Sequence, residues 1–296
     1  MGTSGAAAAH AGIELGGTKI LARLMGSDGV RLAEARFATS TPAQALVDLT
    51  AFLHEGLRGR RLSALGVASF GPIGLDPAGT DYGCLLATPK PGWAGFDLRG
   101  ALLAQFPVPL AIDTDVNAAA LAEQASGAGR GLRSVAYVTV GTGIGAGLAF
   151  EGRTLRGALH PEAGHLLLRR RAGDDAPSSC PYHEDCAEGL AAGPAVARRL
   201  AHGRSLSEDR EAFALVAAYL GDLTASLVLT WSPHRILLGG GVMATDGLRG
   251  AVALAMQGAL GDYLPARDSG YLAAPELEDA GLEGALMLAR AAAGDT

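Results

Sequence analysis

The heptapeptide CPYHEDC holds two of the three cysteines of the chain and one histidine. Cys180, His183 and Cys186 are spaced three residues apart, and structural zinc is usually held by four sulfur or nitrogen ligands in a tetrahedron. The upstream segment HPEAGH offers the fourth ligand, with His165 as the first choice and His160 as the competitor. A disulfide between the two cysteines, or an incidental surface cluster, would explain the same pattern. The spacing therefore predicts a structural zinc site, with these alternatives open.

Two aspartates, Asp113 and Asp115, end the apolar segment VPLAIDTDV and precede NAAALAEQASG, which has a helical pattern. In a continuous strand their side chains would point the same way, because side chains alternate between faces. Asp115 lies at the switch from strand to helix, where a carboxylate could accept the proton of an attacking hydroxyl as a general base. The competing interpretation is a helix cap, a role that aspartate performs well. Spacing alone favours the cap.

Three glycine-rich turns follow short apolar segments and could bind phosphate. None of them has the P-loop pattern GxxxxGK[ST]. Glycine lets backbone N–H groups approach a phosphate without a Cβ in the way, and the threonines and lysine in these turns add donors and charge. An ordinary hairpin explains one such turn, but three together favour a nucleotide. The predicted nucleotide-binding residues are Gly16, Gly17, Thr18, Lys19, Gly141, Thr142, Gly143, Gly239, Gly240 and Gly241.

Glu14 precedes the first of these turns on the same expected strand. A carboxylate at this position could hold a magnesium ion, through water because Mg²⁺ gives up its waters reluctantly. A solvated strand carboxylate is the equally weighted alternative.

The composition is that of a globular protein. Of 296 residues, 49% are hydrophobic and 18% are charged, and the net charge of −6 comes without a basic block, which excludes a disordered chain and argues against a nucleic-acid groove. The longest apolar segment, residues 212–231, is interrupted by Asp222 and is expected to be a buried helix instead of a membrane span. Three cysteines and no export signal favour the cytoplasm, with Cys84 as a buried, inert thiol.

The elements that must carry these residues alternate between strands and helices, which indicates an α/β protein. The pattern of strand, glycine turn and strand around the first turn returns around the second, which suggests two similar lobes facing a common cleft. We expect a flexible leader (residues 1–11), a small lobe (12–117 with a C-terminal helix of about 282–296) and a large lobe (118–281) containing the zinc loop (160–188). The expected elements are hairpins 12–24 and 135–150, strands 62–70 and 108–116, a third buried strand with its glycine turn at 235–243, and helices 42–58, 117–127, 212–231, 246–260 and 282–294, the last packed on the first lobe.

Taken together, these segments resemble the ROK family of sugar kinases, which have the two-lobed actin-like ATPase (ribonuclease H-like) fold. The similarity is greatest to the zinc-containing bacterial fructokinases and extends over nearly the whole chain. Single motifs are weak, but their combination in this order is highly specific. The matching segments are GIELGGTK, GPIGLDP, TPKPGWAGFDL, DTDVNAAALAE, VTVGTGIGAGL, LHPEAGH, CPYHEDCAEGLAAGPA and LLGGGVM.

The resemblance implies ATP-dependent phosphorylation of a hexose at its 6-hydroxyl, with D-fructose as the substrate. It implies Asp115 as the catalytic base, Mg²⁺ with ATP, a structural Zn²⁺ and, as is common in the family, a homodimer. It also makes His165 both a zinc ligand and a sugar contact, with the third glycine turn near the adenosine. The implied substrate-binding residues are Gly71, Pro72, Thr114, Glu162, His165 and Glu188.

The chain departs from the family pattern at three positions. Many members carry aspartate where this chain has Glu14, which loosens the expected metal contact. Glucokinase members have asparagine where this chain has Thr114, which argues against glucose and agrees with fructose. His183 replaces one of three cysteines in the glucokinase zinc loop. Alternatives are a kinase for mannose, glucose or an N-acetylhexosamine, or a non-catalytic sugar-binding regulator, although only 11 residues precede the first expected strand and leave no room for a DNA-binding domain.

Overall fold

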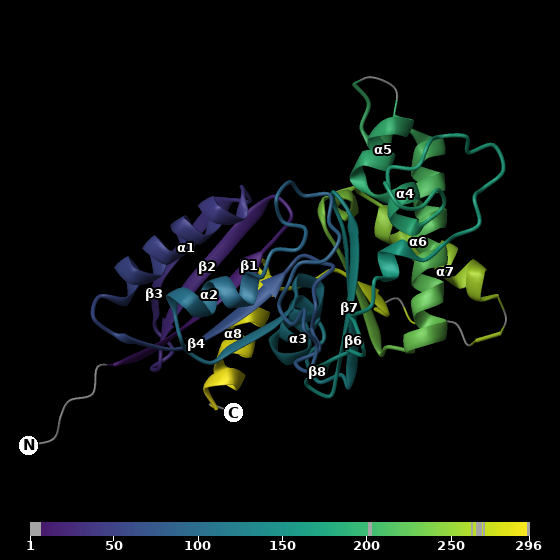
Figure 1. Ribbon diagram of the computed structural model, residues 1–296. Helices are drawn as coiled ribbons and strands as arrows, with labels where there is room; N and C mark the ends of the chain where they lie inside the picture. The colour runs from purple at the N-terminus through teal and green to yellow at the C-terminus, as the bar shows by residue number, and fades with distance from the viewer. Residues whose placement is uncertain (1–6, 201–202, 262, 265–267, 269, 295–296) are drawn as a thin grey trace, which may run out of the picture. The chain divides into compact units, whose positions relative to one another are not determined.

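The computed structural model describes residues 7–200, 203–261, 263–264, 268 and 270–294 (Figure 1). The chain divides into two compact units, which are described separately. Unit 1 consists of Met1–Ala122, Thr154–His160 and Asp279–Thr296, and unit 2 of Glu123–Arg153 and Pro161–Glu278. The expected boundaries near residues 117 and 282 lie within a few residues of this division. The short excursion of Thr154–His160 into unit 1 was not expected.

Unit 1 is built on a five-stranded sheet with the strand order β3-β2-β1-β4-β5. Strands β1, β2 and β3 pair antiparallel, whereas β1 pairs with β4, and β4 with β5, in parallel. The hairpin predicted around the first glycine turn is confirmed, and β3 adds an edge strand that was not predicted. The strands are β1 (Ala8–Leu15), β2 (Lys19–Gly26), β3 (Arg31–Ala38), β4 (Arg61–Ser69) and β5 (Leu110–Thr114).

The predicted leader is wrong in its C-terminal part. Residues 8–11 already belong to β1, and Ala9 and Ala11 are completely buried. Small side chains suit this central strand because helix α8 (Ala280–Ala293) packs against it, as the close contact between Gly12 and Leu286 shows. Residues 1–6 lie outside the described residues.

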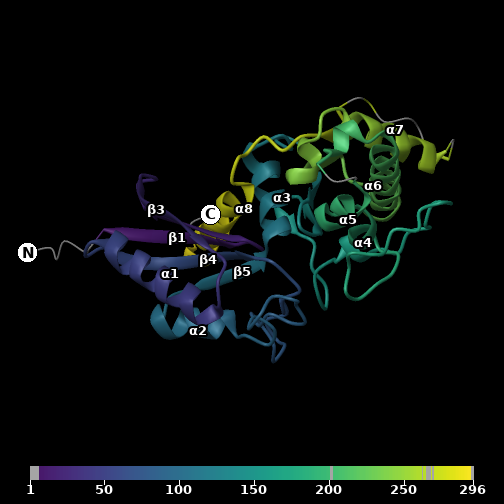
Figure 2. The same cartoon turned by 90° about the horizontal axis from the view of Figure 1, so that it is seen from above.

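Helices cover both faces of the sheet of unit 1. Figure 2 shows α1 (Pro42–Leu57) and α2 (Leu98–Gln105) on one face and α8 on the other. The start of α1 is as predicted, with Pro42 in the first turn and the Thr41 side chain as the N-cap. Helix α8 lies very close to β4, as Gly66 shows: a Cβ atom there would be 1.9 Å from the carbonyl oxygen of Ala285. The prediction that the C-terminal helix packs on the first lobe is confirmed.

Unit 2 repeats the same sheet topology. Its strand order, read from the edge, is β8-β7-β6-β9-β10, which corresponds one for one to β3-β2-β1-β4-β5. Strands β6 and β7 are antiparallel, and β6 pairs with β9 and β9 with β10 in parallel. The duplication predicted from the two hairpins is therefore confirmed for the whole sheet. The strands are β6 (Ser134–Val140), β7 (Ile144–Phe150), β8 (Arg153–Thr154), β9 (Arg235–Gly239) and β10 (Leu272–Ala273).

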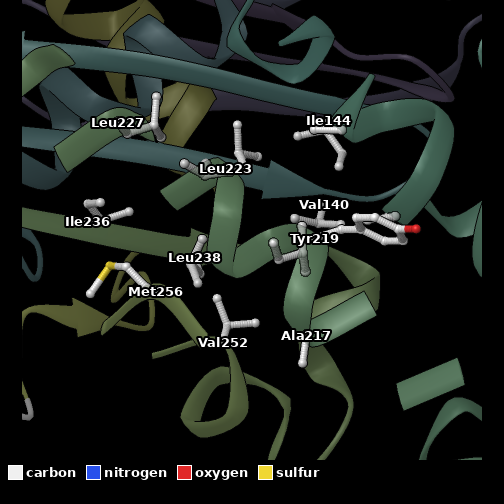
Figure 3. Close-up of a cluster of buried hydrophobic side chains, with 14 of the residues drawn as sticks. Val140, Ile144, Ala217, Tyr219, Leu223, Leu227, Ile236, Leu238, Val252 and Met256 are labelled. Atoms are coloured by element: carbon white, nitrogen blue, oxygen red, sulfur yellow. The ribbon is translucent and has the colours of Figure 1, made fainter. Parts of the chain in front are cut away.

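The core of unit 2 is formed by the buried side chains of its sheet together with helices α6 (Arg210–Trp231) and α7 (Leu248–Leu260), which pack against each other. Figure 3 shows Leu223 and Leu227 of α6 near Ile236 and Leu238 of β9, and Tyr219 beside Val140 of β6. Among the described helices, α6 is the one long and apolar enough to cross a membrane, but 61% of its apolar window is buried inside the protein, as expected for the predicted core helix. The remaining helices are α3 (Asp115–Ser126), α4 (Ala187–Ala191), α5 (Gly193–Arg199) and the 3₁₀ helices η1 (Ala163–His165), η2 (Leu206–Glu208) and η3 (Gly241–Ala244).

Candidate active site and metal centre

In unit 1, the strand register brings three predicted segments to one edge of the sheet. Leu15 of β1 lies opposite Ser69 of β4, and Ser69 lies opposite Thr114 of β5. The first glycine turn (residues 16–19), Gly71 with Pro72, and Asp115 all follow these carboxyl ends directly. In open α/β sheets, ligands bind outside the carboxyl ends of parallel strands. The topology therefore collects the unit 1 candidates where such a site is expected.

Asp115 is the first residue of α3, so the strand ends one residue before it. The hydroxyl of Thr114 accepts a hydrogen bond from the backbone N–H of Asn117 at 3.2 Å and so caps the helix. Asp115 is half-buried, and its Oδ1 accepts from the N–H of Val116 at 2.9 Å. The capping role therefore belongs to Thr114, and Asp115 lies inside the first turn.

Asp113 has a different environment from Asp115. It is completely buried and accepts hydrogen bonds from the Asn117 side-chain amide at 2.8 Å and from the Thr154 hydroxyl at 2.6 Å. The guanidinium of Arg156 lies 3.8 Å from its second oxygen. Asp113 thus fastens residues 154–156 to β5 and is a structural carboxylate.

Glu14 faces the beginning of α8. Its carboxylate lies 2.7 Å from where a Cβ of Gly281 would be and accepts from the N–H of Leu282. Burial raises the pKa of Glu14, the nearby Lys19 ammonium lowers it, and the charge of Asp279 raises it. Glu14 therefore helps to seat α8, and its role toward magnesium stays a prediction.

In unit 2, the second glycine turn (residues 141–143) and the third (residues 239–241) also lie at one sheet edge. Thr139 of β6 is paired with Gly239 of β9, so both turns follow the carboxyl ends of adjacent parallel strands. Gly240 has φ of 91°, and a Cβ there would lie 2.4 Å from the carbonyl oxygen of Val140. Only glycine lets the third turn pack this closely on the end of β6.

The predicted zinc ligands come together in unit 2 as a His/Cys cluster (His165, Cys180, His183 and Cys186), whose ligand atoms all lie within 4.8 Å of one another. The Sγ of Cys180 is 3.7 Å from Nδ1 of His165 and 3.6 Å from Nδ1 of His183, and the Sγ of Cys186 is 3.7 Å from Nδ1 of His165. Zinc with bonds of about 2.3 Å to sulfur and about 2.05 Å to nitrogen gives tetrahedral S···N edges of about 3.6 Å. The donor set and its spacing therefore fit zinc.

The competing interpretations of the cluster find no support. His160 is in unit 1, where its Nε2 accepts a hydrogen bond from the N–H of Ile73 at 3.0 Å. Cys180 and Cys186 are free thiols without a disulfide. Burial raises the pKa of the Cys186 thiol, and the neighbouring Cys180 raises it further. Two adjacent thiolates would therefore need a cation to balance their charge.

Two glutamates lie near the cluster. Desolvation, followed by the negative charge of Glu188, raises the pKa of Glu162 to about 7, although the residue as a whole is exposed. Glu188 is half-buried, and its Oε2 accepts a hydrogen bond from the N–H of Ile144 at 3.0 Å. The same oxygen is 2.6 Å from where a Cβ of Gly143 would be. Glu188 therefore supports the second glycine turn as well as being a predicted sugar contact.

Ile144, the first residue after the second glycine turn, joins that turn to the His/Cys cluster. Its N–H donates to Glu188, which is two residues from Cys186. Its carbonyl oxygen lies against Gly164, where a Cβ would be only 1.8 Å away, and Gly164 precedes His165. On the other side of the turn, the N–H of Gly193 donates to the carbonyl of Gly141 at 2.7 Å. The cluster and the turn thus form one packed assembly.

One residue beside the first glycine turn was not singled out from the sequence. The ammonium of Lys90 donates to the carbonyl oxygen of Gly17. Residue 90 lies in TPKPGW, which was recognised as a motif without an assigned role. The sequence signal that could have identified Lys90 is the scarcity of lysine, since Lys19 and Lys90 are the two lysines among 24 lysines and arginines.

Two bacterial fructokinases match nearly the whole chain. The fructokinase of Zymomonas mobilis subsp. mobilis is 39% identical over 290 residues, with 95% of this chain and 96% of that protein covered. The fructokinase of Pediococcus pentosaceus is 36% identical over 283 residues, with 95% and 97% covered.

Solved structures share the fold. A ROK hexokinase from Thermus thermophilus has a TM-score of 0.79 at 30% identity, covering 97% of this chain and 100% of that one. A ROK family glucokinase from Streptomyces griseus, in complex with glucose and AMPPNP, has a TM-score of 0.76 at 25% identity, covering 96% and 99%. The expected actin-like α/β fold with a repeated sheet is therefore confirmed. Because the sequence model of the ROK family also matches residues 10–292, the chain belongs to the ROK family.

Proposed function

We propose that this sugar kinase transfers the γ-phosphoryl group of ATP to the 6-hydroxyl of D-fructose. The observation that carries the proposal is the register of the two sheets. In unit 1 the register brings Asp115 and the first glycine turn to the carboxyl ends of parallel strands, and in unit 2 it does the same for the second and third glycine turns. Fructokinases that are 36% and 39% identical over most of the chain support the substrate. Thr114, which replaces the asparagine of glucokinases, also favours fructose.

In the proposed reaction, Asp115 accepts the proton of the 6-hydroxyl while that oxygen attacks the γ-phosphorus. The new bond from oxygen to phosphorus forms as the bond to the β-phosphate oxygen breaks, and ADP leaves. Phosphoryl transfer needs mainly positioning and neutralisation of charge, which the backbone N–H groups of the three glycine turns would supply to the phosphates. Mg²⁺ would enter with ATP and neutralise phosphate charge. The proposed sugar ligands are Gly71, Pro72, Thr114, Glu162, His165 and Glu188.

The His/Cys cluster is proposed to hold a structural Zn²⁺. Four protein ligands leave no open position for a catalytic water, so the ion would serve the fold. Its four ligands come from η1 and from the loop before α4. Fixing η1 would hold Glu162, three residues before His165, in place for the sugar.

A coupled ADP-release assay with a panel of hexoses tests the function. We expect the highest kcat/KM with fructose, and lower values with mannose, glucose and N-acetylmannosamine. A preference for one of these would replace fructose as the substrate. A protein that binds sugar but releases no ADP with any of them would be a regulator instead of a kinase.

A pair of variants tests the base. Asp115→Asn should lower kcat by about 10²–10⁴ while sugar binding persists. Asp48→Asn is the control and should keep native kcat, because Asp48 is a half-buried residue of α1 whose side chain accepts a hydrogen bond from Gln44 at 2.8 Å. Native turnover in Asp115→Asn would remove the assignment.

Metal analysis of the purified protein should find one zinc per chain, and its absence would remove the zinc assignment.

We also propose a cytoplasmic homodimer. The three free cysteines suit a reducing compartment, and dimers are common among family members. Light scattering on the purified protein would measure the mass, and a monomer at micromolar concentration would contradict the dimer.

A further inference from the structure

The segment TPKPGW (residues 88–93) has no role in the function proposed above, yet the structure holds it firmly. Trp93 is 2% exposed, and its indole N–H donates to the carbonyl of Ser40 at 2.8 Å. Its ring makes edge contacts with Phe70 and Phe96, both with centroids 5.6 Å away. The N–H of Trp93 also donates to the carbonyl of Lys90 at 3.2 Å. The backbone that carries Lys90 is therefore fixed to the core of unit 1.

The side chain of Lys90 reaches from this segment to the first glycine turn. Its ammonium donates to the carbonyl oxygen of Gly17 and lies 5.5 Å from the centroid of the Phe70 ring. Within the described part of the chain, no carboxylate forms an ion pair with it. Burial lowers the pKa of Lys90, as expected for a cation that is partly removed from water without a counter-charge.

Lys19, the lysine within the turn, has a different situation. Its Nζ lies 3.9 Å from a carboxylate oxygen of Asp279, and its charge acts on Glu14 as well. Two carboxylates of unit 1 thus offset the charge of Lys19. The two lysines of the chain therefore meet at one turn. Lys19 lies near two carboxylates, whereas the partners of Lys90 among the described residues are a carbonyl and an aromatic ring.

We propose that Lys90 is a catalytic residue whose ammonium contacts the oxygens of the phosphoryl group in transfer. The inference rests on the proposed kinase function, because it assigns the first glycine turn to phosphate. A neutral carbonyl is a weaker acceptor than a phosphate oxygen, so the ammonium exchanges Gly17 for the nucleotide when it binds. An ammonium is a compact point charge on a flexible stem, which suits a group whose charge moves during transfer. Lys19 then serves mainly to hold Asp279 and the start of α8.

Steady-state kinetics of Lys90→Met and Lys90→Arg test the assignment. Lys90→Met keeps the length of the side chain and removes the charge, so kcat with ATP and fructose should fall about 100-fold or more. The KM for fructose should stay within about threefold of native, since the lost interaction acts on the phosphoryl group. Lys90→Arg should recover part of the lost rate. Lys19→Met should reduce kcat less than Lys90→Met does.

A spectroscopic readout is independent of turnover. With lysine labelled by ¹³C at Cε, the protein gives two lysine signals, and the one absent in Lys90→Arg belongs to Lys90. Addition of Mg²⁺ and AMPPNP to the native protein should move this signal more than that of Lys19. Thermal unfolding checks that each variant is folded.

The assignment is overturned if Lys90→Met keeps native kcat, if it only raises the KM for fructose, or if saturating nucleotide leaves the Lys90 signal unmoved. These results can be distinguished from a failure of the proposed kinase function. In that case the native protein itself would release no ADP with any sugar and bind no AMPPNP.

Discussion

A buried carboxylate in α3 gives the sharpest test of how unit 2 is held together. Glu123 is completely buried and accepts three backbone hydrogen bonds. Its Oε2 accepts from the N–H of Ala128 at 2.7 Å, and its Oε1 accepts from those of Glu276 and Leu277 at 2.9 and 2.8 Å. The side chain therefore fastens residues 276–277, just before the chain returns to unit 1, to the end of α3.

Replacing Glu123 by glutamine keeps the shape and removes one acceptor. If the amide oxygen keeps the bonds to residues 276 and 277, each becomes a neutral bond and weakens by about 1 kcal/mol. The amide NH₂ then faces the N–H of Ala128, which loses its acceptor at a cost of about 1–3 kcal/mol. Easier burial of an uncharged group offsets part of the loss. We therefore expect Glu123→Gln to lower the free energy of unfolding by about 2–4 kcal/mol.

Thermal and urea unfolding of the ligand-free protein measure this change. For a unit of this size, 1 kcal/mol shifts Tm by about 2–4 °C, so the variant should melt roughly 5–15 °C lower. The matched control is Glu151→Gln, in the same unit. Glu151 forms an exposed ion pair with Arg133, which contributes about 0–1 kcal/mol.

Unfolding free energies of the two variants that differ by less than about 0.5 kcal/mol, the size usual for surface substitutions, would refute this prediction. Such a result would mean that the three hydrogen bonds to Glu123 are replaced without loss when the charge is removed.

Three further predictions follow from contacts described above. Gly66→Ala places a Cβ 1.9 Å from the carbonyl oxygen of Ala285 and should yield little folded protein. The control is Gly258→Ala on α7, where a Cβ would meet no atom within 4 Å and should raise the free energy of unfolding by about 0.5–1 kcal/mol. Equal Tm values for the two variants would contradict both expectations. Because the pKa of Glu162 is raised to about 7, this group is mostly protonated at pH 6 and mostly ionised at pH 8. The KM for sugar should therefore fall as pH rises through this range, and Glu162→Gln should flatten the profile; an unchanged profile in the variant would exclude Glu162 as its source. Chelation of the proposed zinc ion should lower Tm and weaken AMPPNP binding, because Glu188 and Gly164, which lie next to the proposed ligands Cys186 and His165, contact Ile144; calorimetry that finds native affinity after chelation would contradict this link.

Local sequence patterns were sufficient for the turns but not for every element. Glycines that interrupt apolar alternation located both hairpins, and Pro42 located the start of α1. The edge strand β3 alternates exposed and half-buried residues, which is a weaker signal than a buried run. Helix α2 is short and follows a segment rich in proline and glycine, and its Asp97 cap, which accepts from the N–H of Gly100 at 2.7 Å, was not recognised.

Choices between nearby residues needed the tertiary structure. His160 and His165 lie in one hexapeptide, and the decisive difference is that His160 is bound to Ile73 in unit 1. Asp115 and Thr114 are adjacent, and only the hydrogen bond from Asn117 shows which of them caps α3. Lys90 is far from Gly17 in the sequence, so no local pattern could have connected them.

The close packing of α8 on β4 has a consequence for the order of synthesis. Strand β4 ends at Ser69, but α8, which covers it at Gly66, begins only at Ala280. At about 5–20 residues per second, translation separates the two by on the order of ten seconds or more. During that time the first sheet emerges from the ribosome with one apolar face bare, while all strands of unit 2 are completed before the covering helix is made. Unit 1 therefore completes its fold only after α8 has been made, and until then its bare apolar face is a surface that a chaperone would recognise on the nascent chain.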